Sequence, residues 1–195
     1  MITVRERNSE RSRARIIGAA TEEFAAHGYA GARVEAIAQR AGLNKQLISH
    51  HFGGKEGLYR AVLADRFGRP GGELTAADVD PALLFERAAV DSQWLRILLW
   101  EALDTGVPVE APGRRERYAQ RVNAVRAAQV EGRLPAGLDP ELLLLSLFGA
   151  AVYPLLVPQV TELLTGLSPT GRTFRKRYRD HLSRLASVLS GGRSA

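Results

Sequence analysis

The chain has 195 residues, no cysteine and a formal net charge of +6 at pH 7, and its hydrophobic fraction of 45% is typical of a globular protein. This length accommodates one domain, or a small module joined to a helical domain. The absence of cysteine excludes disulfides and cysteine-based zinc sites, and four scattered histidines do not indicate another metal site. We expect no metal and no cofactor.

Neither export nor membrane insertion is expected. The N-terminal segment has no apolar core of signal-peptide length before its charges begin. The longest apolar run, residues 142–157, is interrupted by Ser146, Gly149 and Pro154 and is shorter than a membrane span. We expect a cytoplasmic protein.

The charge is unevenly distributed along the chain. Residues 1–67 carry 11 Lys or Arg against 7 Asp or Glu, residues 68–170 carry 9 against 13, and residues 171–195 carry 7 against 1. Basic segments suit a polyanionic partner, because neutralising phosphates releases counterions and favours nucleic-acid binding. A solvated basic surface without such a partner is the alternative interpretation.

The N-terminal region is predicted to contain four helices. The apolar spacing of the first begins only at Ile16, and Gly28 suits the left-handed residue that ends a helix. Gly42 ends the second helix in the same way. The four are expected at about residues 9–27 or 12–27, 34–41, 45–52 and 55–67.

The third of these helices has one polar and one apolar face. Asn44 is a suitable N-cap, and Leu43, Ile48 and Phe52 are predicted to face the core. The opposite face carries side chains that donate or accept hydrogen bonds, namely Lys45, Gln46, Ser49 and His50. Two short helices joined by a glycine-containing turn indicate a helix-turn-helix, whose second helix enters the major groove of DNA.

A longer motif in this region resembles the DNA-binding domain of the TetR/AcrR repressors. It covers about residues 12–67. The matching residues are Gly28-Tyr29, Val34, Ile37-Ala38, Ala41-Gly42, Asn44-Lys45, Ile48, His51-Phe52, Lys55-Glu56 and Leu58-Tyr59. Two positions depart from the family pattern, because Arg33 stands where the family usually has Thr or Ser, and Ser49 where it usually has Tyr.

Each DNA-contact candidate is expected to touch either bases or phosphates. Lys45, Gln46 and Ser49 are candidates for base edges, since Lys pairs with guanine acceptors and Gln with adenine. The helix starts at Asn44-Lys45 and Lys55 are suited to phosphates. The full set of candidates is Arg33, Asn44, Lys45, Gln46, Ser49, His50, His51 and Lys55.

Three features leave two interpretations open. His51 is either a phosphate contact, as its position often is in the family, or a half-buried group beside Phe52. Leu47 either touches a thymine methyl or rests on the first helix, and packing is slightly favoured. The basic segment Arg5 to Arg15 is either an arm that reaches DNA or a disordered tail.

The rest of the chain, residues 68–195, is predicted to form a second helical domain after a linker near residues 68–79. Asp80-Pro81 and Asp139-Pro140 each place a capping carboxylate before a proline suited to the first helical position. Nothing resembles a strand. Helices are expected at about residues 81–90, 92–104, 112–131, 140–164 and 170–189, with a kink or shift at Pro154.

The last two helices are predicted to form a dimer interface. The helix from Pro140 is apolar on nearly every side in its first four turns and so needs cover from several neighbours, most economically from a second copy of the chain. Two helices from each subunit would form a four-helix interface. The candidate residues are Leu147, Phe148, Ala151, Phe174, Tyr178, Leu182 and Leu185. The basic residues of the final helix are interpreted as a solvated flank rather than a DNA contact.

The resemblance also implies a small-molecule effector bound in the helical domain. Aromatic residues on several helices are the candidate lining, although each is at least as well explained by core packing: Phe85, Trp94, Trp100, Tyr118 and Tyr153. No catalytic triad or phosphate loop is present, so we do not expect an enzyme.

The sequence thus predicts an all-α protein. Residues 1–67 hold a three-helix helix-turn-helix domain and its connecting helix, and residues 68–195 a ligand-binding and dimerisation domain. The predicted function is a homodimeric transcriptional regulator, a repressor released from a pseudo-palindromic double-stranded DNA operator by a small molecule. The alternative is a ligand-binding or interaction protein that keeps the helix-turn-helix as a structural module.

Overall fold

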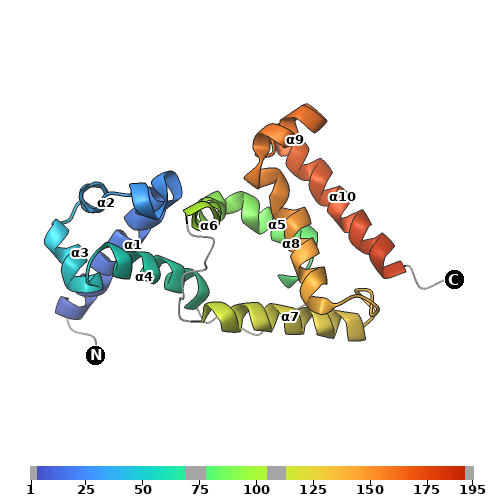
Figure 1. Ribbon diagram of the computed structural model, residues 1–195, viewed down its shortest axis with the longest axis horizontal. Coiled ribbons are helices and arrows are strands. Elements are labelled where there is room, and N and C mark those ends of the chain that lie inside the picture. The colour runs from blue at the N-terminus through green and yellow to red at the C-terminus, as the bar shows by residue number, and fades with distance from the viewer. Residues whose placement is uncertain (1–3, 69–77, 105–112, 192–195) are drawn as a thin grey trace. The chain divides into compact units, whose positions relative to one another are not determined.

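The computed structural model describes residues 4–68, 78–104 and 113–191, which form helices and no strand (Figure 1). The all-α prediction is confirmed. The helices are α1 (Val4–Gly31), α2 (Val34–Ala41), α3 (Lys45–Phe52), α4 (Lys55–Gly68), α5 (Pro81–Val90), α6 (Ser92–Asp104), α7 (Arg114–Val130), α8 (Pro140–Leu156), α9 (Pro158–Thr165) and α10 (Arg172–Gly191).

The chain divides into two compact units. The first comprises Met1–Arg69 and Arg96–Arg114, and the second comprises Pro70–Leu95 and Arg115–Ala195. Helices α1 to α4 and most of α6 therefore belong to the first unit. The predicted linker at residues 68–79 lies almost entirely outside the described residues.

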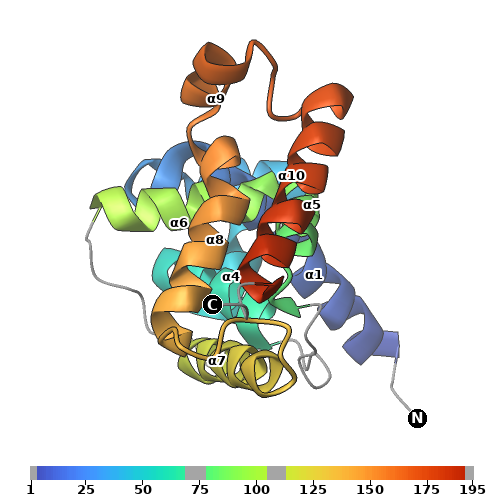
Figure 2. The same cartoon turned by 90° about the vertical axis from the view of Figure 1, so that its right-hand side faces the viewer.

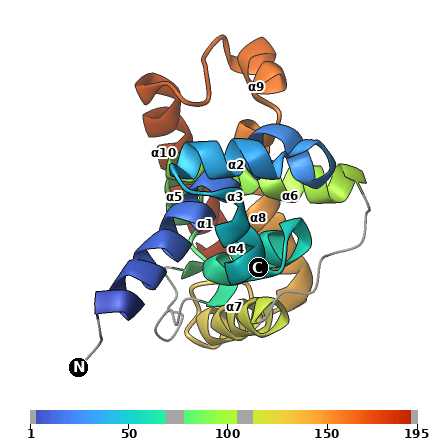
Figure 3. The same cartoon turned by 90° about the vertical axis from the view of Figure 1, so that its left-hand side faces the viewer.

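The first unit is built around side chains from four helices. Ile16 and Phe24 of α1, Ile37 of α2 and Ile48 of α3 are fully buried. The rings of Phe24 and Tyr59 meet edge-on, with centroids 4.9 Å apart. Figure 3 turns the side of this unit that carries α2 and α3 toward the reader. Burying Ile48 fixes which face of α3 points outward.

Helix α1 differs from its prediction at both ends. It begins at Val4 instead of residue 9 or 12, so the segment from Arg5 to Arg15 is helical and not a tail. The side chains of residues 7–15 are almost all exposed, so this part of the helix has no apolar face for periodicity to detect. At Gly28 the positive φ is confirmed, but its ψ of 179° is extended, and helical geometry resumes over the last residues to Gly31.

The two Asp-Pro helix starts are confirmed. The side chain of Asp80 accepts from the backbone N–H groups of Ala82 and Leu83, and that of Asp139 accepts from Leu142. Each carboxylate satisfies amides that have no partner within the helix, and proline fits the first position because it has no N–H to satisfy.

The predicted helix 140–164 is wrong in one respect: it is two helices, α8 and α9, bent by 86°. The break falls at Val157 before Pro158 and not at Pro154, and Val157 has the non-helical angles φ −125° and ψ 66°. Pro154 lies inside α8. Because Pro154 has no N–H, it cannot donate to the carbonyl of Ala150. That carbonyl accepts instead from the Tyr178 hydroxyl at 2.7 Å. The Pro154 carbonyl likewise accepts from Thr161 at 3.1 Å.

The second unit buries two apolar clusters. In one, α5, α8 and α10 pack together through Phe85, Ala151, Phe174 and Leu182 (Figure 2). In the other, α7 packs on α8 around Val125 and Leu147. Among the described residues, no single helix is long and apolar enough to cross a membrane, and α8 with α9 meets the criterion only as a bent pair.

Candidate DNA-binding interface

The turn between α2 and α3 is closed by glycine and by a capping side chain. Gly42 has the left-handed φ of 60°, and its N–H and that of Leu43 donate to the last carbonyls of α2. The Asn44 side chain accepts from the N–H of Gln46 at 2.9 Å. The predicted caps are confirmed, and α2 and α3 form a helix-turn-helix.

The outward face of α3 is polar. Lys45, Gln46, Ser49 and His50 are exposed, while Ile48 is fully buried. These exposed side chains are the ones assigned to DNA from the sequence. Leu47 is half-buried, in keeping with the packing interpretation.

Lys45 is paired with a residue that the sequence analysis did not select. Its Nζ lies 2.5 Å from Oε1 of Glu35, in the first turn of α2, and both side chains are more than half exposed. The hydrogen bond from Lys45 lowers the pKa of Glu35, so this carboxyl is ionised. The glutamate therefore places a negative charge beside the first residue of α3.

Lys55, the expected phosphate contact at the start of α4, makes two contacts within the unit. Its Nζ donates to the carbonyl of Ala30 at 3.1 Å and lies 4.9 Å from the centre of the Tyr29 ring. An ammonium has three donors, so these contacts leave donors for a phosphate.

The two histidines of α3 have different surroundings. His50 is exposed, whereas His51 is half-buried between His50 and Phe52, with ring centroids 5.3 and 6.1 Å away. The Arg13 guanidinium lies 5.5 Å from the Phe52 ring. Part of the basic N-terminal segment thus packs against the end of α3.

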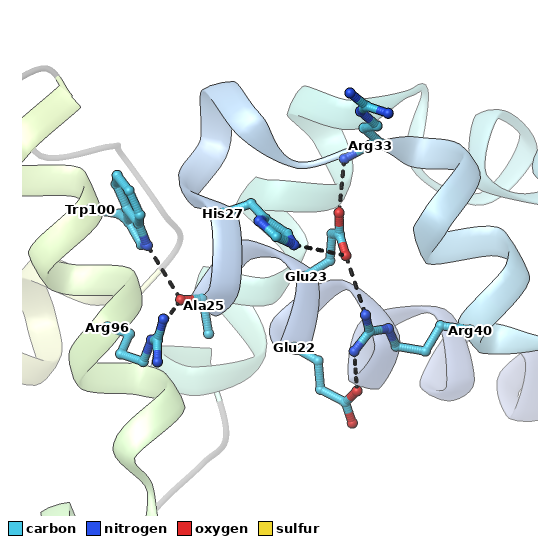
Figure 4. Close-up of polar contacts among 8 residues, drawn as sticks. All are labelled: Glu22, Glu23, Ala25, His27, Arg33, Arg40, Arg96 and Trp100. Atoms are coloured by element: carbon cyan, nitrogen blue, oxygen red, sulfur yellow. Dashed lines mark hydrogen bonds and ion pairs between the residues drawn. The ribbon is translucent and has the colours of Figure 1, made fainter.

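A buried glutamate of α1 holds the start of α2. Arg33, at the N-cap of α2, makes no side-chain cap, and its N–H instead donates to Oε1 of Glu23 at 3.2 Å. The other oxygen of Glu23 lies 3.4 Å from Arg40, which also pairs with Glu22 at 2.8 Å (Figure 4). The Glu22 partner raises the pKa of Arg40. Glu23 is 3% exposed and holds the N–H of the N-cap residue from another helix, whereas a Thr or Ser side chain at this position would accept from an N–H of the first turn.

The break at Gly28 is covered by two side chains of α6. The carbonyl of Ala25 accepts from Nε of Arg96 at 2.9 Å and from the Trp100 indole at 3.3 Å (Figure 4). A carbonyl at the end of a helical segment lacks its usual partner, so these donors satisfy it. Neither residue was assigned this role from the sequence.

Tyr59 lies beside a buried ion pair of the first unit. Arg114 and Glu101 form two parallel hydrogen bonds of 2.7 and 2.8 Å. Burial, and secondarily the negative charge of Glu101, raises the pKa of Tyr59 to about 12. Tyr59 therefore stays neutral at physiological pH.

The candidate effector residues differ in burial and are divided between the two units. Phe85 is fully buried in contact with Phe174 and Tyr178, and Tyr153 is 53% exposed. Trp94 is half-buried and Tyr118 exposed in the second unit, while Trp100 belongs to the first. Among the described residues no cluster of three His, Asp or Glu side chains suits a metal ion.

The seven dimer candidates also separate by burial. Leu147, Ala151, Phe174 and Leu182 are buried within the second unit, Phe148 and Tyr178 are half-buried, and Leu185 is exposed. The exposed apolar side chains of the same helices are Leu142, Leu145, Tyr153, Leu185 and Val188. The α10 seam expected from periodicity therefore faces α5 and α8 over most of its length.

Comparison with known proteins identifies the family. Residues 16–62 match the family described as bacterial regulatory proteins, tetR family, and residues 82–184 match the tetracyclin repressor-like C-terminal domain. The chain belongs to the TetR family. The family is one of DNA-binding transcriptional regulators and not of enzymes.

Relatives within the TetR family cover most of the chain. The HTH-type transcriptional repressor SCO4008 of Streptomyces coelicolor is 36% identical over 85% of this chain and 89% of its own. The HTH-type transcriptional regulator SrpR of Pseudomonas putida is 34% identical over 67% of each chain. The solved structure of SCO4942 from Streptomyces coelicolor has a TM-score of 0.73 at 27% identity, covering 89% of this chain and 97% of that one.

Proposed function

We propose that this TetR-family regulator is a cytoplasmic homodimeric repressor that binds a pseudo-palindromic operator and is released by a small-molecule effector. The observation that carries the DNA-binding part is the outward face of α3. Three hydrogen-bonding side chains, Lys45, Gln46 and Ser49, are exposed on a helix anchored by the buried Ile48. A helix of this kind fits the major groove, where base edges are distinguishable.

The proposed DNA contacts are of two kinds: contacts to base edges, which give sequence preference, and contacts to phosphates, which position the protein. Lys45 and Gln46 are assigned to base edges, with Ser49 and His50 on the same exposed face. The N-terminal amides of α3 near Asn44 and the ammonium of Lys55 are assigned to phosphates, which hold the helix in register. Arg33 and His51 are assigned to the backbone at the edge of this surface.

The dimer is proposed to form through the exposed apolar faces of α8 and α10. Leu142 and Leu145 are 65% and 68% exposed, and Leu185 and Val188 are 39% and 72% exposed. Exposed apolar side chains favour association, and a two-fold axis pairs the same surface of each subunit with itself. A two-fold dimer carries two α3 helices and fits half-sites about 34–36 Å apart.

The effector is assigned to the second unit, which matches the tetracyclin repressor-like C-terminal domain. Of the aromatic residues expected to line it, Phe85, Trp94, Tyr118 and Tyr153 lie in this unit and are proposed to contact the effector, whereas Trp100 lies in the first unit. Release requires only that the effector bind better to a conformation whose α3 helices miss the half-sites. Adding the effector is then expected to abolish the complex with operator DNA in a gel-shift assay.

Operator binding is tested by gel shift on DNA flanking the gene, with a salt titration. Lys45→Ala and Gln46→Ala are expected to relax base preference at defined positions by about 1–3 kcal/mol each. Lys55→Ala is expected to weaken binding to all sequences similarly and to reduce the salt dependence. If the three variants behave alike, the division of contacts is wrong. If the wild type shows no salt-sensitive, sequence-preferring binding, the alternative of a structural helix-turn-helix stands.

The dimer is tested by analytical ultracentrifugation. Leu145→Glu is expected to shift the protein to monomer, since each two-fold interface would contain two desolvated carboxylates. Val130→Glu is the matched control, because Val130 is 88% exposed and lies on α7, which is not one of the two proposed interface helices. A Leu145→Glu variant as dimeric as the wild type would place the interface elsewhere.

A further inference from the structure

The Glu35–Lys45 pair is the feature of the α3 surface that the proposed function does not yet use. Glu35 is the second residue of α2 and Lys45 the first of α3, and their side chains meet at 2.5 Å. The two helices thus present a donor and an acceptor side by side on one surface.

Folding stability does not account for this pair. Both side chains are more than half exposed, and exposed ion pairs add little to stability because water and salt screen them. A carboxylate on a surface that meets phosphates also repels them, so a pure phosphate contact at Lys45 would be stronger without Glu35. Reading a base edge is a role in which a carboxylate is useful.

We propose that Glu35 and Lys45 together read one G·C base pair in each half-site. Lys45 donates to the guanine acceptors, and Glu35 accepts from the N4 amino group of the paired cytosine. This inference rests on the proposed operator binding by α3. Guanine O6 and cytosine N4 are joined by a Watson–Crick hydrogen bond of about 2.9 Å. This distance is close to the 2.5 Å between Nζ of Lys45 and Oε1 of Glu35.

The chemistry of the two side chains favours G·C over A·T. After donating to Glu35, the Lys45 ammonium keeps two donors, and guanine offers two adjacent acceptors, N7 and O6. An A·T pair also has a donor, N6 of adenine, next to an acceptor, O4 of thymine. Lys45 would find only this one acceptor beside the donor, and the thymine methyl group lies next to it. The Lys45 hydrogen bond that lowers the pKa of Glu35 keeps the acceptor ionised.

The test is selection of operators from a randomised library by the full-length protein, followed by affinity measurements on single-substitution sites. The wild type is expected to prefer G·C at one position of each half-site. Glu35→Ala and Lys45→Ala are each expected to reduce that preference about fivefold or more, at the same base pair. Glu35→Gln keeps an acceptor oxygen and is expected to retain part of the preference.

Glu56→Ala is the matched control. Glu56 is also exposed and paired with a basic residue, Arg60 at 2.7 Å, but that partner lies on its own helix. This variant is expected to keep the wild-type preference. Two results would overturn the inference while leaving operator binding intact: Glu35→Ala binding every sequence more tightly with unchanged preference, or Glu35→Ala and Lys45→Ala affecting different base pairs. A wild type without any sequence preference would overturn the proposed function as well.

Discussion

Replacing Gly28 with alanine is expected to lower the free energy of unfolding of the first unit by about 2–4 kcal/mol. Gly28 has φ 66° and ψ 179°, a backbone conformation that residues other than glycine adopt only with strain. A Cβ built there lies 2.9 Å from the Trp100 ring, which is held in place by its bond to the Ala25 carbonyl. The ring cannot retreat without giving up that bond. Urea unfolding followed by circular dichroism measures the effect.

The matched control is another glycine of the same helix. Gly18 lies inside α1 with helical geometry, and a Cβ built there meets nothing within 4 Å. Gly18→Ala is therefore expected to be neutral or to stabilise by about 0.5–1 kcal/mol, because alanine has less conformational freedom in the unfolded chain. Equal losses from both substitutions would show that the Gly28 conformation and the Trp100 contact are not the cause.

Glu23→Ala is expected to cost about 2–3 kcal/mol of the same unfolding free energy. The substitution leaves the N–H of Arg33 without its acceptor and takes from Arg40 one of its two carboxylate partners. The start of α2 then loses its bond to α1, and the Arg33 side chain supplies no cap in its place. Thermal or urea unfolding of the variant and the wild type measures the difference.

Two further variants separate the contributions of Glu23. Glu23→Gln keeps an oxygen that accepts from Arg33 but removes the charge that faces Arg40, so an intermediate loss is expected. Glu22→Ala removes the exposed partner of the same arginine and is expected to change stability by less than about 1 kcal/mol. If Glu22→Ala were as costly as Glu23→Ala, loss of an ion pair of Arg40, and not loss of the bond to the Arg33 N–H, would explain the effect.

Loss of the Glu23 bond at the start of α2 bears on function through the position of α3. The turn after α2 is fixed by bonds to the carbonyls of Ala38 and Gln39 at its end. A frayed α2 displaces Glu35 and with it the partner of Lys45. Glu23 thus helps to hold Glu35 beside Lys45 without itself belonging to the proposed DNA-binding surface.

The sequence by itself determined where most helices begin and end, because caps act within one turn. Asn44 and Gly42 mark the ends around the turn, and Asp80 and Asp139 mark two later starts, all as predicted. The sequence also determined which face of α3 is buried, since the predicted core residue Ile48 is the buried residue of this helix and the polar side chains of Lys45, Gln46 and Ser49 are exposed. These signals need no knowledge of neighbouring helices.

Only the tertiary structure decided which neighbour covers each face. Periodicity marks Phe174 and Leu182 as one apolar seam, but a seam packs equally well on the same chain or on a partner, and here α5 and α8 cover it. Pro154 and Pro158 look alike in the sequence. Pro154 lies inside α8, where the Tyr178 hydroxyl donates to the Ala150 carbonyl that has lost its helical partner. Pro158 lies at the bend between α8 and α9.

The remaining tertiary contacts join residues far apart in the chain. Residues 96–104 of α6 pack with α1 in the first unit through Arg96 and Trp100, more than 70 positions from Ala25. Glu23 accepts from the N–H of Arg33 ten residues away, and Glu35 pairs with Lys45 over the same separation. Helical periodicity relates residues three or four apart, so contacts between helices become visible only once the chain has folded.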